Sequence, residues 1–288
     1  MEKHYRFAGV ELTVSIPEKW MYQEDRQLAP FRVSDVREAH VFRFEAVDAL
    51  LPPQGEEQVC LPAFRMYREG ERTVRYFGSV QEDWQNGYIR AEHRDKQHFV
   101  QVKMHDLAGT IGTKMILTAL SAEHLIASVG GFVFHCSYIA WNGKAILFTA
   151  PSGAGKSTQA ELWRAHRGAR IINGDRAAVR LAGETLLAEG IPFAGSSQYC
   201  ENSSLPVAAI VYLSQAPETT IRRLRGVGAF ARIWEGISVN TWDNEDMERV
   251  SRMAQRAAGE IPVYHLACTP DETAVLALEQ ELRKLGRS

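Results

Sequence analysis

The sequence predicts an α/β protein in which a β-rich N-terminal region precedes a domain with a phosphate-binding loop (P-loop). Two observations lead to this fold class. The apolar segment 145–149 runs into a Gly-rich turn and then into a helical stretch, which is the strand–loop–helix order of a P-loop. The first 105 residues contain short segments rich in β-branched and aromatic residues, separated by polar or Pro/Gly turns.

Length and charge limit the classes of function. The chain has 288 residues, enough for one large domain or two moderate ones. Its 33 basic and 35 acidic residues give a net charge of −2, so neither a nucleic-acid nor a membrane partner is expected. No stretch approaches the roughly 18 apolar residues of a membrane helix, and Met1–Phe7 lacks the apolar core of a signal peptide. A cytoplasmic location is therefore expected, and the four cysteines, which have no C-x-x-C spacing, are interpreted as thiols.

The N-terminal region, residues 1–105, is interpreted as an antiparallel accessory region. The expected strands are Tyr5–Ile16, His40–Val47, Thr73–Val80, Gly87–Glu92 and His98–Met104. The pair Asn86-Gly87 predicts a tight hairpin turn between Trp84-Gln85 and Tyr88-Ile89. The pattern of this region does not reveal a function.

Residues 106–288 are interpreted as the P-loop domain. A helix is expected over Lys114–Val129 and ends at Gly130-Gly131. Strands Phe132–Ile139 and Ala145–Thr149 are expected to form a hairpin that leads into the loop, and a helical stretch, Gln159–His166, follows it. The remaining expected elements are strands Ala169–Ile172, Ala177–Leu181, Val207–Leu213 and Thr220–Leu224, and helices Gly228–Ile237, Asn244–Ala258 and Asp271–Lys284.

The P-loop residues indicate binding of a nucleoside triphosphate. Small residues let successive backbone N–H groups curl around a phosphate, and the helix N-terminus adds partial positive charge. Lys156 can reach the terminal phosphates, and the Ser157 hydroxyl can ligand a magnesium ion. Ala150 replaces the first Gly of G-x-x-x-x-G-K-[ST], and the alternative is a turn that merely caps a helix. The expected phosphate-binding residues are Ser152, Gly153, Ala154, Gly155, Lys156, Ser157 and Thr158.

Two further residues are candidates for chemistry. Asp175 lies 19 residues after Lys156, at the end of a strand expected to lie beside the loop strand. A carboxylate there could hold magnesium or accept the proton of an attacking hydroxyl, and the alternative is an Asp in an ordinary turn. His135, in an apolar strand one hairpin before the loop, could bind phosphate or shuttle a proton, or be a satisfied core histidine.

Two other segments carry weaker signals. The small-residue loop 191–197 could line a phosphate or substrate site through its hydroxyls and amides, or could be a surface loop. Arg222, Arg223 and Arg225 could supply a clamp on a transferred phosphate, or could form a solvated strand edge.

Three segments together are similar to the HPr serine kinase/phosphorylase family. They are the hairpin His135-Cys136-Ser137 with Gly143–Phe148, the loop Ser152–Ser157, and the run Gly168–Asp175. That family shares its fold with phosphoenolpyruvate carboxykinases and with HPr-kinase-like enzymes of biosynthetic clusters for modified peptides. The resemblance covers roughly residues 131–224 and leaves residues 1–105 without a counterpart.

The resemblance implies roles for individual residues. Lys156 and Ser157 would bind ATP and magnesium, and His135 would belong to the active site. The family carries an acidic pair after the next strand, whereas Asp175 here stands between Gly174 and Arg176. HPr kinases also place a Glu directly after the loop hydroxyl, where this chain has Thr158, so HPr itself is not expected to be the substrate. HPr kinases typically form oligomers, which implies a homo-oligomer.

The sequence thus predicts an ATP- and Mg²⁺-dependent phosphotransferase that acts on a hydroxyl of a peptide, protein or small molecule. Asp175, His135 and Lys156 are its expected catalytic residues, and Ser157 and Asp175 its expected metal ligands. Two alternatives remain open: a nucleotide-binding regulatory or maturation protein that transfers nothing, and a phosphorylase or phosphatase that uses the same site.

Overall fold

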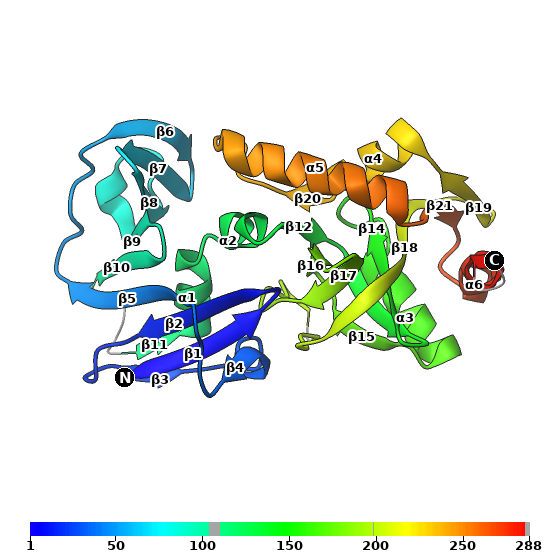
Figure 1. The fold of residues 1–288 in the computed structure, drawn as a ribbon, viewed down its shortest axis with the longest axis horizontal. Coiled ribbons are helices and arrows are strands. Elements are labelled where there is room, and N and C mark those ends of the chain that lie inside the picture. Colours follow the sequence, from blue (N-terminus) through cyan, green and yellow to red (C-terminus); the bar gives the residue numbers. More distant parts are fainter. Residues whose placement is uncertain (104–109, 198, 286–288) are drawn as a thin grey trace. The chain divides into compact units, whose positions relative to one another are not determined.

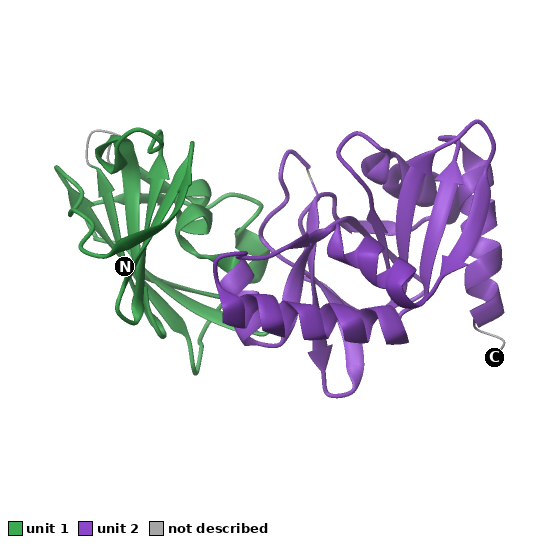
Figure 2. Ribbon diagram, turned by 90° about the horizontal axis from the view of Figure 1, so that it is seen from above, with its two compact units in different colours: residues 1–122 green, residues 123–288 purple. Residues whose placement is uncertain are grey.

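The chain divides into two units, residues 1–122 and residues 123–288 (Figure 2). The computed structural model describes residues 1–103, 110–197 and 199–285. The expected boundary at 105–106 and the expected strand end at Met104 lie outside the described residues. Residues 110–122 belong to the first unit, because strand β11 (Thr110–Gly112) pairs in parallel with β3 (Met21–Gln23). No local pattern indicates a pairing between segments so distant in the chain.

The first unit is built on a sheet with the strand order β4-β1-β2-β5-β10-β9-β8-β7-β6 (Figure 1). Its elements are β1 (Glu2–Phe7), β2 (Val10–Ser15), η1 (Ala29–Phe31), β4 (Arg32–Val33), β5 (His40–Val47), β6 (Glu56–Leu61), β7 (Phe64–Glu69), β8 (Arg72–Gly78), η2 (Trp84–Asn86), β9 (Gly87–Arg94), β10 (Gln97–Lys103) and α1 (Thr113–Ala119). The sheet is mixed rather than purely antiparallel, because β5 runs parallel to both of its neighbours, β2 and β10.

Two local predictions in this unit are wrong. The expected strand Tyr5–Ile16 is a hairpin, since Ala8 and Gly9 both have positive φ and reverse the chain between β1 and β2. The structure describes Asn86 and Gly87, and they do not form the tight hairpin turn that was expected there. Gly78 pairs with Gly87, so residues 79–86 form a wider connection that contains η2, and Gly87 is extended with φ −65°.

The second unit is built on a sheet with the order β15-β13-β14-β18-β17-β16-β12-β20, and β21 pairs with β18 and β19 (Figure 1). Helix α2 (Ala122–Ser128) leads into it. Its elements are β12 (Gly131–His135), β13 (Ser137–Trp141), β14 (Lys144–Thr149), α3 (Lys156–Arg167), β15 (Arg170–Asn173), β16 (Arg176–Ala182), β17 (Thr185–Gly190), β18 (Ser204–Gln215), β19 (Thr220–Leu224), α4 (Gly226–Trp234), β20 (Ile237–Ser238), α5 (Asn244–Glu260), β21 (Val263–Cys268) and α6 (Glu272–Leu285). None of the helices in the described ranges has the length and apolar character needed to cross a membrane.

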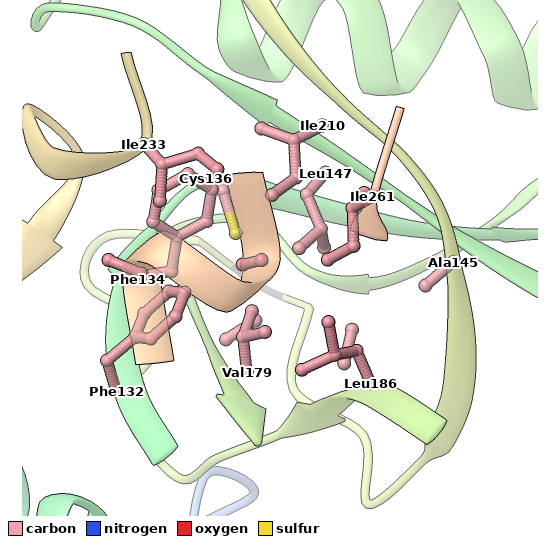
Figure 3. Packing of buried hydrophobic residues seen from close by; sticks show 14 of the residues in the cluster. Phe132, Phe134, Cys136, Ala145, Leu147, Val179, Leu186, Ile210, Ile233 and Ile261 are labelled. Carbon is pink, nitrogen blue, oxygen red and sulfur yellow. The ribbon is translucent and has the colours of Figure 1, made fainter. Parts of the chain in front are cut away.

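Helices cover both faces of the central strands of this unit. Side chains alternate between the faces of a strand, so Ala145 and Leu147 of β14 pack into a core shared with α4 and α5 (Figure 3). Ile146 and Phe148 point the other way, into a core shared with α3 and α6. Because β14 is buried on both faces, it reads as a continuous apolar run rather than an alternating one.

The hairpin before the loop differs from its predicted form. The expected strand Phe132–Ile139 is two strands, β12 and β13, which separate at Cys136. The turn between β13 and β14 is confirmed, with Asn142 and Gly143 at φ 49° and 72°. Because β13 occupies the edge of β14, β15 pairs with β13 and does not lie beside the loop strand as expected. Since β13 is antiparallel to both, the carboxyl ends of β14 and β15 still meet at one edge.

The helix expected over Lys114–Val129 is interrupted at Ser121, which has φ 55° and separates α1 from α2.

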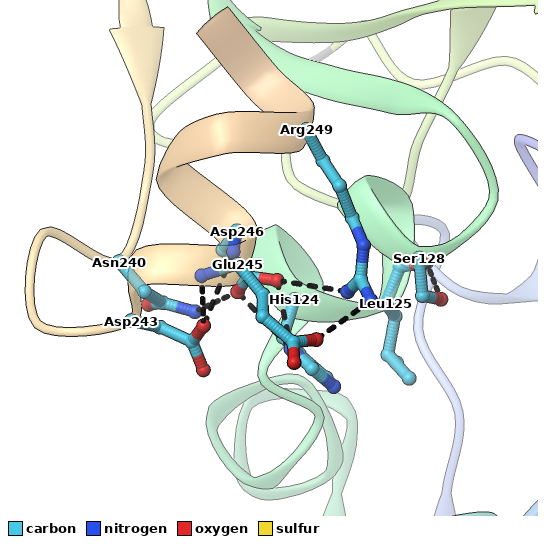
Figure 4. Close-up of polar contacts among 8 residues, drawn as sticks. All are labelled: His124, Leu125, Ser128, Asn240, Asp243, Glu245, Asp246 and Arg249. Carbon is cyan, nitrogen blue, oxygen red and sulfur yellow. Dashed lines mark hydrogen bonds and ion pairs between the residues drawn. The ribbon is translucent and has the colours of Figure 1, made fainter.

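A buried carboxylate connects α2 to α5. Both carboxylate oxygens of Asp246 lie 3.0 Å from His124 Nδ1, and Asn240 Nδ2 donates to Oδ2 at 3.1 Å (Figure 4). Asp243 caps α5 by accepting from two backbone N–H groups. Asp246 thus links the two helices, whereas Asp243 stabilises the start of α5.

Candidate active site

The P-loop has the backbone of an anion-binding turn. It connects β14 to α3, and Gly153 and Gly155 adopt φ +78° and +108°, which side-chain-bearing residues rarely take. Gly155 occupies the N-cap position of α3, and no described side chain caps the helix there. The first N–H groups of α3 therefore remain available to an anion, and the helix dipole favours negative charge at this end.

Lys156 is held against the loop. Its Nζ donates to the carbonyl oxygen of Ala150 at 3.0 Å and lies 3.5 Å from that of Pro151. The side chain is 9% exposed, and burial lowers the pKa of Lys156, against the opposing effect of the nearby Asp175 charge. These carbonyls keep the ammonium group beside the loop amides. A phosphate bound by those amides could therefore also contact the ammonium group.

One cavity of about 520 Å³ brings most of the predicted site together. The predicted residues that line it are His135, Ser152, Gly153, Gly155, Lys156, Ser157, Thr158 and Asp175. Ser196 and Ser197 of the 191–197 loop form part of its wall. Ala154 instead lines a second cavity on another side of the loop. Arg222, Arg223 and Arg225 are exposed on β19 and just after it and do not line either cavity.

Asp175 lies in the turn between β15 and β16 and contacts two basic side chains. Its Oδ1 lies 3.5 Å from His135 Nε2, and its Oδ2 lies 3.3 Å from Arg176 Nε. The hydrogen bond with His135, together with the charges of Arg176 and Lys156, lowers the pKa of Asp175 despite its partial burial. A lowered folded-state pKa means that this ionised carboxylate stabilises the fold at neutral pH. That contribution is lost as the pH falls through the folded pKa.

Asn173, which the sequence did not single out, positions Asp175. It is fully buried, and its Oδ1 accepts from the backbone N–H groups of Asp175 and Arg176 at 2.9 and 3.0 Å. Its Nδ2 donates to the carbonyl oxygens of Ile191 and Phe193 at 3.1 and 3.3 Å. One amide thus fixes both the Asp175 turn and the start of the 191–197 loop.

Replacing Asn173 with Ala is expected to lower the free energy of unfolding by roughly 2–4 kcal/mol, because buried backbone groups in two loops lose their partner. Urea denaturation measures this change. Gln255→Ala, at an exposed position of α5, is the control and should shift stability by less than about 0.5 kcal/mol. Equal urea midpoints for wild type and Asn173→Ala would contradict the positioning role.

The profile of one protein family matches most of this second unit. It is described as SynChlorMet cassette protein ScmC, and the match covers residues 110–271, more than half of the chain. The chain belongs to the ScmC family. The matched range contains the P-loop, His135, Asn173 and Asp175, whereas residues 1–109 lie outside it.

Among solved structures, the chain is similar to the HPr(Ser) kinase/phosphatase from Coxiella burnetii. The two chains are 11% identical with a TM-score of 0.33, and the match covers 54% of this chain and 93% of that chain. At this distance the likeness does not bear on the reaction. No curated protein matches the chain.

This ScmC-family chain has a second carboxylate in the cavity that the sequence analysis missed. Glu161 accepts from the Tyr199 hydroxyl at 2.8 Å and from Arg164 Nε at 2.6 Å, and the bond from Tyr199 is the main cause that lowers the pKa of Glu161. Both Glu161 and Tyr199 line the cavity. Glu161 lies three residues after Thr158 on α3, and residues at that spacing share a helix face. The three-residue spacing from Thr158 could therefore have identified Glu161 from the sequence.

Proposed function

We propose that this chain is an ATP- and Mg²⁺-dependent phosphotransferase that acts on a hydroxyl of a peptide, protein or small molecule. The observation that carries the proposal is the shared cavity: the P-loop, Lys156 and an ionised Asp175 all face one space of about 520 Å³. Phosphoryl transfer depends mainly on positioning and on stabilising charge, and these groups supply both.

The phosphate groups of ATP would lie along the loop. The N–H groups at the start of α3 would donate to phosphate oxygens, and Lys156 would exchange its bonds to the Ala150 and Pro151 carbonyls for a terminal phosphate. The oxygens of Ser157 and Asp175 line the same cavity and form a donor set that suits Mg²⁺. When bound, this ion would neutralise charge on the phosphates.

The acceptor hydroxyl would enter beside Asp175. The carboxylate is ionised at neutral pH and can take the hydroxyl proton, and His135 orients it through the 3.5 Å contact. Ser196, Ser197 and Tyr199 form a polar wall of the cavity that can hydrogen-bond to the acceptor. Acceptors of several kinds could therefore bind in the cavity, because these hydroxyl groups recognise polar atoms and not the shape of one particular acceptor.

One observation favours a second candidate, a nucleotide-binding regulatory or maturation protein that does not transfer phosphate. Asp175 is already paired with His135 and Arg176, which stabilises its ionised form and makes it a weaker base. A carboxylate engaged in this way could serve binding alone. A phosphorylase or phosphatase would use the same groups to transfer the phosphoryl group from a phosphorylated acceptor to inorganic phosphate, which gives pyrophosphate, or to water, which gives phosphate.

Turnover measurements separate these functions. The purified chain is incubated with ATP and Mg²⁺ and a panel of peptides and small molecules that carry hydroxyl groups, and ADP and phosphorylated product are quantified. We expect product with at least one hydroxyl acceptor and loss of product when EDTA removes the metal. Tight ATP binding with no transfer to any acceptor would instead support the regulatory protein. Release of phosphate from a phosphorylated acceptor, or of pyrophosphate when inorganic phosphate is added, would support the phosphatase or phosphorylase.

A further inference from the structure

A second cavity of about 650 Å³ adjoins the P-loop. It shares Gly153, Gly155 and Thr158 with the first cavity, so the two spaces meet at the loop. Its other wall is formed where β18 and β21 end, by Gln215 and Cys268 and the residues that follow them. Strands β14, β18 and β21 run parallel, so their carboxyl ends lie at the same edge, where open α/β sheets bind their ligands.

The walls of this second cavity are mainly apolar. Ala154 comes from the loop, Ala216 and Pro217 follow β18, and Pro270 follows β21. Apolar walls suit the faces of a planar ring, and such sites use few polar groups to orient their ligand. Gly153, Gly155 and Thr158 line both cavities, so a ligand with phosphates at one end and a ring at the other could occupy the first cavity and the second cavity together.

Gln159 provides an unexplained polar group at this cavity. Its side chain is 2% exposed, and Nε2 donates to Cys268 Sγ at 3.4 Å. Its Oε1 is buried and has no hydrogen-bond partner among the residues that the structure describes. A buried acceptor without a partner destabilises a fold, so such a group in a cavity wall points to a ligand that donates to it.

We propose that the second cavity holds the nucleoside of the nucleotide, with Gln159 Oε1 accepting from the exocyclic amino group of adenine. This inference rests on the proposed function, because it requires the phosphates to lie on the P-loop. Adenine presents an amino donor on its edge and two apolar faces, which match the single acceptor and the apolar walls of the cavity. Hypoxanthine, which has a carbonyl oxygen in place of that amino group, would meet Gln159 Oε1 with a second acceptor.

Calorimetry with three ligands tests this assignment: ATP, ITP and inorganic tripolyphosphate, each with Mg²⁺. For the wild type we expect ATP to bind roughly 10-fold more tightly than ITP, the effect of one hydrogen bond to a group that is otherwise unpaired. In Gln159→Leu the preference for ATP over ITP should disappear, while tripolyphosphate affinity stays within about 2-fold. Gln255→Leu, at an exposed position of α5, is the matched control and should behave as wild type.

Gln159→Leu should fold, because it replaces a buried amide whose oxygen is unpaired in the described part of the chain, and whose Nε2 bonds there only to the weak acceptor Cys268 Sγ, with an apolar side chain of similar size. A second variant, Ala216→Phe, places a ring in the cavity from a partly exposed position and should reduce ATP affinity to that of tripolyphosphate. If all three ligands bind the wild type with equal affinity, or if both variants keep the ATP preference, the nucleoside assignment is wrong and the P-loop assignment stands. If none of the ligands, tripolyphosphate included, binds the wild type, the proposed function fails and this assignment fails with it.

Discussion

Replacing Asp175 with Asn is expected to lower the rate of phosphoryl transfer by roughly 10²–10⁴-fold, and ATP affinity stays near the wild-type value if the carboxylate acts as the general base. The amide keeps the size of the side chain but cannot accept a proton from the acceptor hydroxyl. It also loses the charge that pairs with His135 and Arg176. Single-turnover rates and calorimetry with ATP measure the two quantities separately.

The other outcomes of this substitution assign Asp175 differently. If rate and affinity fall together, Asp175 acts mainly as a metal ligand. A fully active Asp175→Asn protein would remove this residue from the mechanism and leave His135 and Glu161 as the candidate proton acceptors in the cavity. Asp95→Asn serves as the control, because Asp95 is exposed and has φ 48°, a conformation that Asn tolerates.

Replacing Lys156 with Ala is expected to reduce turnover by at least roughly 10²-fold and to weaken ATP binding, without unfolding the protein. The ammonium group stabilises charge on the terminal phosphates, whereas the shape of the loop depends on the backbone of Gly153 and Gly155. Calorimetry measures the affinity, and thermal melting checks the fold.

Lys144→Ala is the matched control for this variant. Lys144 is exposed at the start of β14, at the end of the strand away from the loop, so its removal should leave ATP affinity unchanged. Wild-type affinity and activity in the Lys156→Ala protein would contradict the assignment of the P-loop.

Elements with strong local signals were predicted well. Strands β5 and β19 have the bounds expected from their β-branched and aromatic residues, and α5 begins at the expected Asn244 because Asp243 caps it. The strand, loop and helix around residues 145–167 also follow the prediction. In these segments, residues close together in the sequence are enough to predict the structure, through periodicity, a helix cap, or glycines that take positive φ.

Strand order and breaks within strands were predicted less well. The apolar run Phe132–Ile139 gave no sign that it would separate at Cys136 into strands with different partners. The insertion of β13 between β14 and β15 was also missed, although it decides how Asp175 reaches the loop. Pairing between distant strands depends on which edges remain free after the rest of the sheet has formed, and local patterns do not contain that information.

The sequence by itself determined the loop between β14 and α3, because this turn needs only two glycines and the start of a helix in the right order. The tertiary structure alone decided what surrounds that loop. It brought His135 to Asp175 from another strand, placed Asn173 beneath both loops, and left Gln159 Oε1 buried without a described partner. The physical reason is that hydrogen bonding and burial of these side chains depend on groups far away in the chain, which meet them only when the sheet is assembled.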